Sequence, residues 1–144
     1  MIYISSDHAG FNLKEEIKKL LETEGHEFLD LGPSENSRCD YSRYAISLAK
    51  KIQQDPSSRG ILVCGSGLGV SMAANRFSGV RAAVCRSAED ARLSREHNDA
   101  NVVCLGERLT ESATALEIIK MFMETKFEGG RHQQRIDLFN SLGE

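Results

Sequence analysis

The stretch Gly60-Ile61-Leu62-Val63-Cys64-Gly65-Ser66-Gly67-Leu68-Gly69-Val70-Ser71 joins a short apolar run, a cysteine and three glycines at alternate positions. A short apolar run bounded by glycines is typical of a buried strand, and the residues after the turn are compatible with a helix. Backbone N–H groups point outward at such a turn and can bind an anion. The stretch therefore predicts a strand, an anion or oxyanion site, and a helix, with the thiol of Cys64 beside the N–H donors.

Strand-like and helix-like segments alternate on both sides of this stretch. We expect strands at 1–5, 26–31, 61–64, 79–84 and 102–105, and helices around 13–21, 45–52, 68–75, 87–97, 113–123 and 136–142. Gly25 is expected to end the first helix, and Ser87 and Thr110 to cap two later ones. Because the strands are continuously apolar, the pattern indicates an α/β protein in which helices cover both faces of a five-stranded parallel sheet.

Length, charge and cysteine spacing narrow the class of protein. The 144 residues predict one domain covering residues 1–144, and the net charge of −3 offers no basic field for nucleic acid. No apolar run is long enough to span a membrane, and no signal-peptide pattern opens the chain, so we expect a cytoplasmic protein without membrane association. The four cysteines contain no CxxC pair, which argues against a cysteine zinc site.

The glycine loop has two well-known alternatives. A dinucleotide-binding fingerprint would need glycine at the position of Val70, and a phosphate-binding Walker A loop would need a Gly-Lys-Ser/Thr run; the sequence has neither. A simple structural turn needs one or two glycines rather than three. We therefore favour an anion or oxyanion site.

Asp7-His8 and Cys64 are both expected where a parallel strand ends. Open parallel sheets bind ligands at this edge. Taken alone, Cys64 could equally be a small buried hydrophobe, and Asp7-His8 could cap a helix. Their shared edge favours a functional site.

Two further groups are candidates for substrate binding. Arg131 and Arg135 lie four residues apart, hence on one helix face, and could hold a phosphate or simply be a solvated surface. His97 and Asn98 precede the fifth strand and so belong at the opposite edge from Cys64. His97 therefore serves a neighbouring subunit's site, or is a helix-terminal histidine that interacts with the helix dipole.

Taken together, the motifs resemble ribose-5-phosphate isomerase type B, within a group that includes galactose-6-phosphate and allose-6-phosphate isomerases. The resemblance covers nearly the whole chain, and it rests on Asp7-His8-Ala9-Gly10, Asp40-Tyr41, Cys64-Gly65-Ser66-Gly67-Leu68-Gly69, Ala74-Asn75, Glu96-His97-Asn98 and Glu128-Gly129-Gly130-Arg131-His132-Gln133-Gln134-Arg135.

The resemblance implies a Rossmann-like three-layer α/β/α sandwich and a homodimer, or a tetramer of two such dimers, with active sites shared between subunits. It implies that ribose 5-phosphate and ribulose 5-phosphate are interconverted in the pentose phosphate pathway without cofactor or metal. The helix from about residue 130 would pack on the partner subunit. A hexose-6-phosphate isomerase of the same group and a non-catalytic sugar-phosphate sensor are the alternatives.

The resemblance also implies roles for individual residues. Cys64 would abstract the proton, His97 of the partner would open the sugar ring, and Ser66, where relatives often have threonine, would relay a proton. The implied substrate-binding residues are Asp7, His8, Tyr41, Gly65, Ser66, Gly67, Leu68, Gly69, Asn98, Arg108, Arg131 and Arg135.

Overall fold

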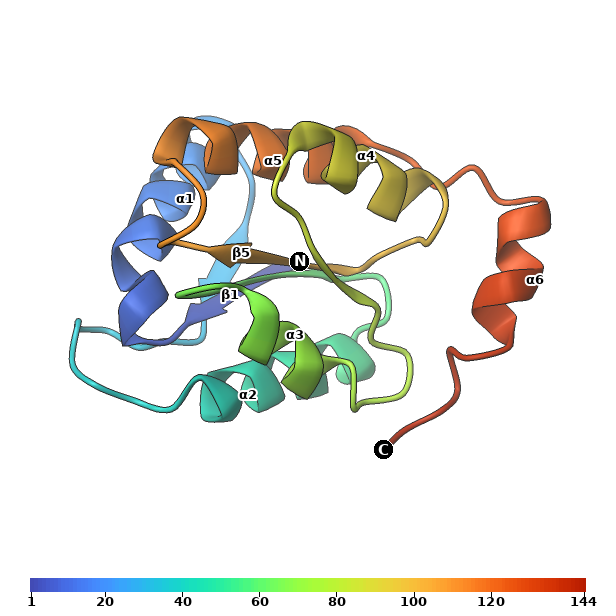
Figure 1. Cartoon of the computed structure of the whole chain (residues 1–144), viewed down its shortest axis with the longest axis horizontal. Coiled ribbons are helices and arrows are strands. Elements are labelled where there is room, and N and C mark those ends of the chain that lie inside the picture. The colour runs from blue at the N-terminus through green and yellow to red at the C-terminus, as the bar shows by residue number, and fades with distance from the viewer.

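The computed structural model describes residues 1–144 and contains one five-stranded sheet flanked by helices (Figure 1). The strands are parallel and lie in the order β2-β1-β3-β5-β4. The elements are β1 (Ile2–Ser6), η1 (His8–Gly10), α1 (Phe11–Thr23), β2 (Phe28–Asp30), α2 (Tyr41–Gln54), β3 (Arg59–Cys64), α3 (Leu68–Ala74), β4 (Ala82–Val84), α4 (Ala88–Glu96), β5 (Val102–Gly106), α5 (Ser112–Glu124) and α6 (Arg131–Asp137). Helices α1, α4 and α5 cover one face of the sheet, and α2 and α3 cover the other. The predicted three-layer α/β/α arrangement is confirmed.

The central strand β3 supplies both hydrophobic cores. Side chains alternate across a strand, so Ile61 and Val63 enter the core beneath α1 and α5, while Leu62 and Cys64 enter the core beneath α2 and α3. All four residues are at most 5 % exposed. This double burial explains why the segment is continuously apolar.

The two edge strands are shorter than predicted. Residues 26–31 were expected to form a strand, but the N–H of His26 closes the end of α1 on the carbonyl of Leu21, with Gly25 in the left-handed conformation at φ +75°. Residues 79–84 form a strand only at Ala82–Val84. Gly79 and Arg81 direct their N–H groups to the carbonyl of Asn140 and the side chain of Asn101 instead of a strand ladder.

The predicted helix ends are partly right. Gly25 ends α1 as predicted, and the hydroxyl of Ser87 caps α4 by accepting the N–H of Asp90. The predicted Thr110 cap is wrong: α5 begins at Ser112 after Glu111, and the N–H of Thr110 belongs to the turn that follows β5.

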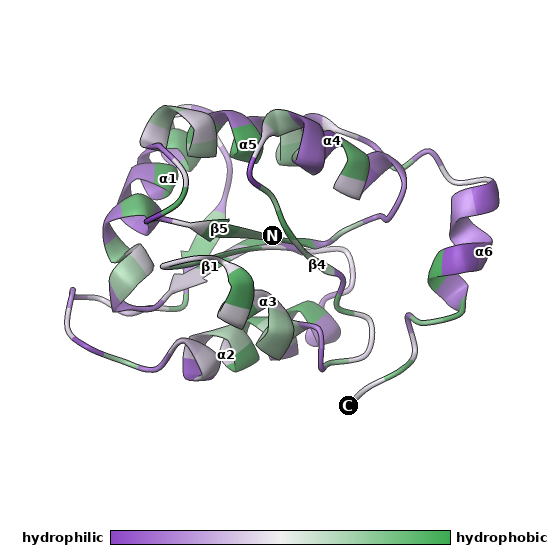
Figure 2. Ribbon diagram, viewed as in Figure 1, coloured by the Kyte–Doolittle hydropathy of each residue, from purple (hydrophilic) through white to green (hydrophobic).

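Helix α6 lies apart from the layers, beyond the end of the sheet at which β5 begins (Figure 1). It ends at Asp137, so the prediction that the helix extends through Phe139 and Leu142 is wrong. Most of its surface is hydrophilic, in contrast to the strands (Figure 2). Phe139 and Leu142 line a groove of about 510 Å³ and remain 46 % and 67 % exposed. None of the helices combines the length and apolar character needed to cross a membrane.

Candidate functional site

A cavity of about 370 Å³ opens where β1 and β3 end. It brings together the two groups that the sequence predicts at this edge of the sheet. Its lining consists of Asp7, His8, Ala9, Tyr41, Cys64, Gly65, Ser66, Gly69, Arg108 and Leu109. Ala9 and Leu109 were not predicted; they contribute apolar wall, for which the sequence gives no distinctive signal.

The thiol of Cys64 is held by the loop that follows it. Cys64 is the last residue of β3 and is 5 % exposed, yet it lines the cavity. The N–H of Gly67 donates a hydrogen bond to its Sγ at 3.1 Å, and the N–H of Leu68 donates to the Oγ of Ser66 at 3.2 Å. Two of the predicted free N–H groups are therefore engaged inside the loop. Those of Gly65 and Ser66 donate no hydrogen bond within the chain.

Two glycines permit close approaches at this loop. Gly67 has φ +79°, and a Cβ there would lie 3.0 Å from the carbonyl carbon of Leu105. A Cβ on Gly69 would lie 2.6 Å from the ring of Tyr41. The glycines let the loop pass over β5 and let the tyrosine ring close one wall of the cavity.

Asp7 and His8 are fixed by backbone contacts. The carboxylate of Asp7 accepts the N–H of Gly10 at 3.0 Å, so the predicted cap is present in a residue that also lines the cavity. The Nδ1 atom of His8 lies 3.2 Å from the carbonyl oxygen of Cys39 and 3.3 Å from its nitrogen. This leaves the other side of the imidazole for a ligand.

Arg108 brings positive charge to the same cavity. Its backbone N–H donates to the carbonyl of Gly65 at 3.1 Å, and its guanidinium lies over that residue, where a Cβ would be 3.1 Å from Nη1. A guanidinium at this position can pair with an anionic oxygen of a ligand.

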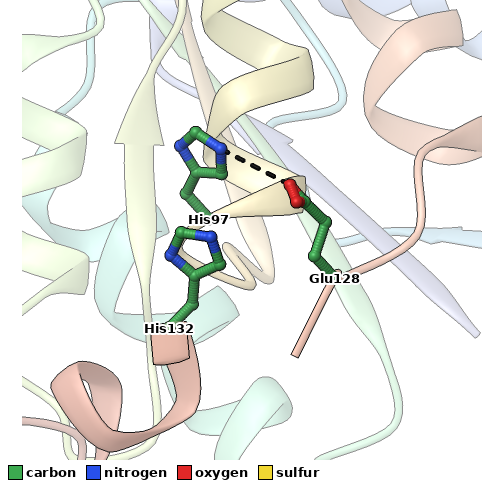
Figure 3. A group of neighbouring side chains, drawn as sticks. All are labelled: His97, Glu128 and His132. Carbon is green, nitrogen blue, oxygen red and sulfur yellow. Dashed lines mark ion pairs between the residues drawn. The ribbon is translucent and has the colours of Figure 1, made fainter. Parts of the chain in front are cut away.

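A second group of side chains lies at the other edge of the sheet. His97 follows the last residue of α4, Glu128 lies in the loop before α6, and His132 lies in the first turn of α6 (Figure 3). The rings of His97 and His132 stack with centroids 4.4 Å apart, and His97 Nε2 lies 3.5 Å from Glu128 Oε1. Burial lowers the pKa of His132, and the charges of Arg131 and His97 lower it further.

The remaining predicted residues divide between these places. Gly67 ends the loop after β3 and Leu68 begins α3, and neither residue lines the cavity. Asn98 lines the groove beside Phe139, while Arg131 and Arg135 are exposed on α6. None of these last three residues lines the Cys64 cavity of the same chain. His97 and Cys64 lie at opposite edges of the sheet, as predicted from their places in the sequence.

Glu128 and His132 were absent from the predicted site residues. Both fall inside the Glu128–Arg135 motif, but their proximity to His97 depends on the hydrogen bond from the N–H of Glu128 to the carbonyl of Glu96 at 3.1 Å. Residues more than 30 positions apart give no local pattern from which such docking could be predicted.

The other cysteines differ from Cys64. Burial raises the pKa of Cys85 to about 11 and that of Cys104 well above its usual value. Neither residue lines the Cys64 cavity. Cys39 is partly exposed and contacts His8 through its backbone. Cys85 and Cys104 thus act as small core residues.

Comparison with known proteins connects this geometry to a family. A family model described as Ribose/Galactose Isomerase matches residues 2–139. The ribose-5-phosphate isomerase B of Escherichia coli is 41 % identical over 141 residues, which cover 98 % of this chain and 95 % of the relative. A probable ribose-5-phosphate isomerase B of Mycoplasma pneumoniae is 45 % identical over 136 residues, covering 94 % and 90 %.

Solved structures give the same result. The ribose-5-phosphate isomerase B of Clostridium thermocellum superimposes with a TM-score of 0.94 at 44 % identity, covering 96 % of this chain and 94 % of the other. The ribose-5-phosphate isomerase B of Mycoplasma genitalium, solved with bound ribulose 5-phosphate, superimposes with a TM-score of 0.93 at 42 % identity. The match covers 95 % of this chain and 91 % of the other. The chain therefore belongs to the ribose/galactose isomerase family.

Proposed function

We propose that this protein interconverts ribose 5-phosphate and ribulose 5-phosphate by proton transfer at Cys64. The observation that carries the proposal is the cavity in which the Cys64 thiol lies with the side chains of Asp7, His8 and Arg108. A thiol, hydrogen-bonding groups and a fixed positive charge suit a small polar, anionic substrate. The family membership and the relatives named ribose-5-phosphate isomerase B support the same reaction.

Cys64 is the base in the proposed reaction. Its thiolate removes the proton from C2 of the open-chain aldose and returns it to C1, so no proton is lost overall. The N–H of Gly67, 3.1 Å from the sulfur, stabilises negative charge there. The hydroxyl of Ser66, two residues after Cys64 in the same loop, relays a proton between the oxygens on C1 and C2.

The intermediate is a cis-enediolate with negative charge on oxygen. The N–H groups of Gly65 and Ser66 are free to donate to that oxygen, whereas those of Gly67 and Leu68 already bind within the loop. An oxyanion donor of this kind commonly contributes about 3 kcal/mol to transition-state stabilisation. Asp7 and Tyr41 would orient the sugar hydroxyls.

A partner subunit completes the proposed site. His97, Asn98, Arg131 and Arg135 lie away from the Cys64 cavity of their own chain. In a homodimer, α6 of one copy would pack on the other copy. Two features favour this packing: α6 lies apart from the layers of its own chain (Figure 1), and Phe139 just after it is exposed. His97 of one copy would then open the ring of sugar bound at Cys64 of the other.

The phosphate would bind between the two subunits. Arg131 and Arg135 on one helix face offer paired hydrogen bonds to phosphate oxygens, and His8 of the facing subunit adds a ring nitrogen. Fixing the phosphate places C2 of the sugar over Cys64. The homodimer, or a tetramer of two such dimers, is thus the functional unit that we propose for this chain of residues 1–144.

A hexose 6-phosphate is the second candidate substrate, because the family description names galactose as well as ribose. The discriminating experiment incubates the protein separately with the 5-phosphate of ribose and the 6-phosphates of allose and galactose and measures ketose formation. We expect the highest kcat/KM with ribose 5-phosphate. A higher value with a hexose phosphate reverses the assignment, and binding without turnover of any sugar would make the protein a sugar-phosphate sensor.

A further inference from the structure

The side chains of His97, Glu128 and His132 form a group that the proposed isomerisation uses only in part. The reaction needs His97 but assigns no step to Glu128 or His132. Each of the three residues offers one ligand atom, and these atoms lie within 4.8 Å of one another. They come from three separate segments: the end of α4, the loop before α6 and the first turn of α6 (Figure 3).

The spacing of the group fits coordination to one metal ion. Two atoms that each lie about 2.0–2.1 Å from a tetrahedral Zn²⁺ are about 3.3 Å apart. His97 Nε2 and Glu128 Oε1 are 3.5 Å apart, which is longer than a charge-assisted hydrogen bond and close to that separation. The side chain of Glu128 is 43 % exposed and can move toward the ion.

His132 provides an independent indication of a ligand. The residue is 6 % exposed, and its Nε2 atom has no hydrogen-bond partner. An unpaired polar atom at this depth is costly unless something binds it. Figure 3 shows one nitrogen of each ring on the side where the Glu128 carboxylate lies, so the open nitrogen of His132 belongs to the same group.

The ligand types select the class of ion. Two imidazoles and one carboxylate suit Zn²⁺ and similar first-row cations, whereas Mg²⁺ prefers oxygen ligands and keeps several waters. Three protein ligands leave a fourth position open for water or an anionic oxygen. Arg131 and Arg135, on the same helix as His132, disfavour a bare cation but favour an anion in that fourth position.

We propose that His97, Glu128 and His132 form a zinc-binding site whose occupancy inhibits the enzyme. A zinc ion on Nε2 of His97 occupies the atom that would exchange a proton with the sugar ring oxygen. Zinc binding therefore inhibits the isomerase reaction instead of activating it, and removal of the zinc restores the reaction. The inhibition rests on the proposed function, but zinc binding itself does not.

Zinc binding is tested by calorimetric titration of the whole protein with ZnCl₂. We expect one Zn²⁺ per chain, and affinity at least about tenfold weaker in Glu128→Gln and in His132→Asn. The matched control is Glu24→Gln, which removes a carboxylate 3.9 Å from His26 Nε2, a pair without a second histidine. Titration of Cys64→Ala identifies any zinc held by the thiol.

The enzymatic arm measures residual rate against Zn²⁺ concentration, each variant normalised to its own zinc-free rate. We expect inhibition that EDTA reverses, that Mg²⁺ does not reproduce, and that needs more zinc in Glu128→Gln. Wild-type zinc affinity in both Glu128→Gln and His132→Asn overturns the proposal. So does loss of zinc binding in the control Glu24→Gln, or loss of zinc binding in Cys64→Ala alone. If His132→Asn does not fold, the zinc affinity of Glu128→Gln decides between these outcomes, because the side chain of Glu128 is exposed and its replacement should leave the fold intact. Zinc binding that depends on Glu128 in a protein without isomerase activity would refute the proposed function and leave the metal site standing.

Discussion

The Cys64 cavity and the His97–α6 face are built in opposite ways. The first lies at the ends of β1 and β3, where Asp7 and Cys64 are at most 7 % exposed and backbone hydrogen bonds hold the thiol and its loop. The second is assembled from a helix end, a loop and a short outlying helix, and the side chain of His97 is 38 % exposed. If sites are shared as proposed, the Cys64 cavity is the rigid half-site, which one chain fixes by itself, and the His97–α6 face is an outlying half-site that a neighbouring copy must position.

The largest effect is expected for Cys64→Ala. Removing the proposed base should lower kcat about 10³-fold or more while sugar-phosphate binding persists. The measurement is kcat for ribose 5-phosphate together with calorimetric binding of the same sugar. Turnover at the wild-type rate would remove Cys64 from the mechanism.

Cys104→Ala is the matched control. Cys104 lies on the neighbouring strand β5 and packs in the same core as Cys64, but it is fully buried. Its burial raises the pKa of its thiol well above the usual value, so the thiol stays protonated at neutral pH. We expect wild-type kcat and a loss of about 1 kcal/mol in the free energy of unfolding.

Arg135→Ala should affect substrate binding. A charge-assisted hydrogen bond to phosphate contributes about 1.5–3 kcal/mol, so KM should rise about 10–100-fold with kcat little changed. Arg92→Ala is the control, because Arg92 is paired with Glu89 and Glu96 on the surface of α4. A fall in kcat alone would contradict the proposal that Arg135 holds the phosphate.

A smaller effect, an approximate halving of activity, is expected in a mixed dimer that tests whether each active site is shared between two chains or contained in one. In a heterodimer of one Cys64→Ala chain and one His97→Ala chain, one of the two shared sites has both residues intact. We expect about half of the wild-type activity per heterodimer, well above either mutant homodimer. Purified heterodimers with no more activity than the homodimers would show that each chain completes its own site.

The smallest effect on catalysis is expected for Asp30→Asn, at the end of the edge strand β2 and outside the lining of the Cys64 cavity. Burial raises the pKa of Asp30, but hydrogen bonds from Lys18 and Lys14 outweigh it and leave the pKa below 3.8. Lys14 is fully buried against Asp30 at 2.9 Å. The substitution should cost about 2 kcal/mol in the free energy of unfolding at pH 7, with kcat within about twofold.

The pH dependence of this ion pair has a definite direction. Because the folded-state pKa of Asp30 is lowered, its stabilisation is present above the unfolded value of 3.8 and is lost as the pH falls below it. Urea unfolding at pH 7 and pH 3 should therefore show a smaller difference between wild type and Asp30→Asn at pH 3. An equal difference at both pH values would assign the effect to packing rather than charge.

The sequence predicts the rigid half better than the outlying half. The apolar run that ends at Cys64 and the periodicity of α2 depend on local patterns that burial enforces, and both appear as predicted. The ends of β2 and β4, the cap of α5 and the end of α6 do not. There, single hydrogen bonds decide the conformation: local ones for β2 and α5, such as that from His26 to Leu21, and one to a distant segment for β4, from Gly79 to Asn140.

The site followed the same division. Asp7, His8 and Cys64 were predicted at one edge because parallel strands end together, and they line one cavity. The grouping of His97 with Glu128 and His132 could not be predicted, since it depends on how the segment before α6 docks on α4. Motif resemblance identified the residues of that segment but not their neighbours.

Helix α6 is joined to the rest of the chain through Gly129 and Gly130, which have φ +73° and +57°. No atom lies within 4 Å of the position that a Cβ would take at either glycine. If two copies must meet to complete each site, turnover per chain becomes a readout of self-association. Specific activity should then fall when the protein is diluted below the dissociation constant of the dimer, and it should recover on reconcentration. The reaction rate would report the assembly of the protein as directly as it reports its chemistry.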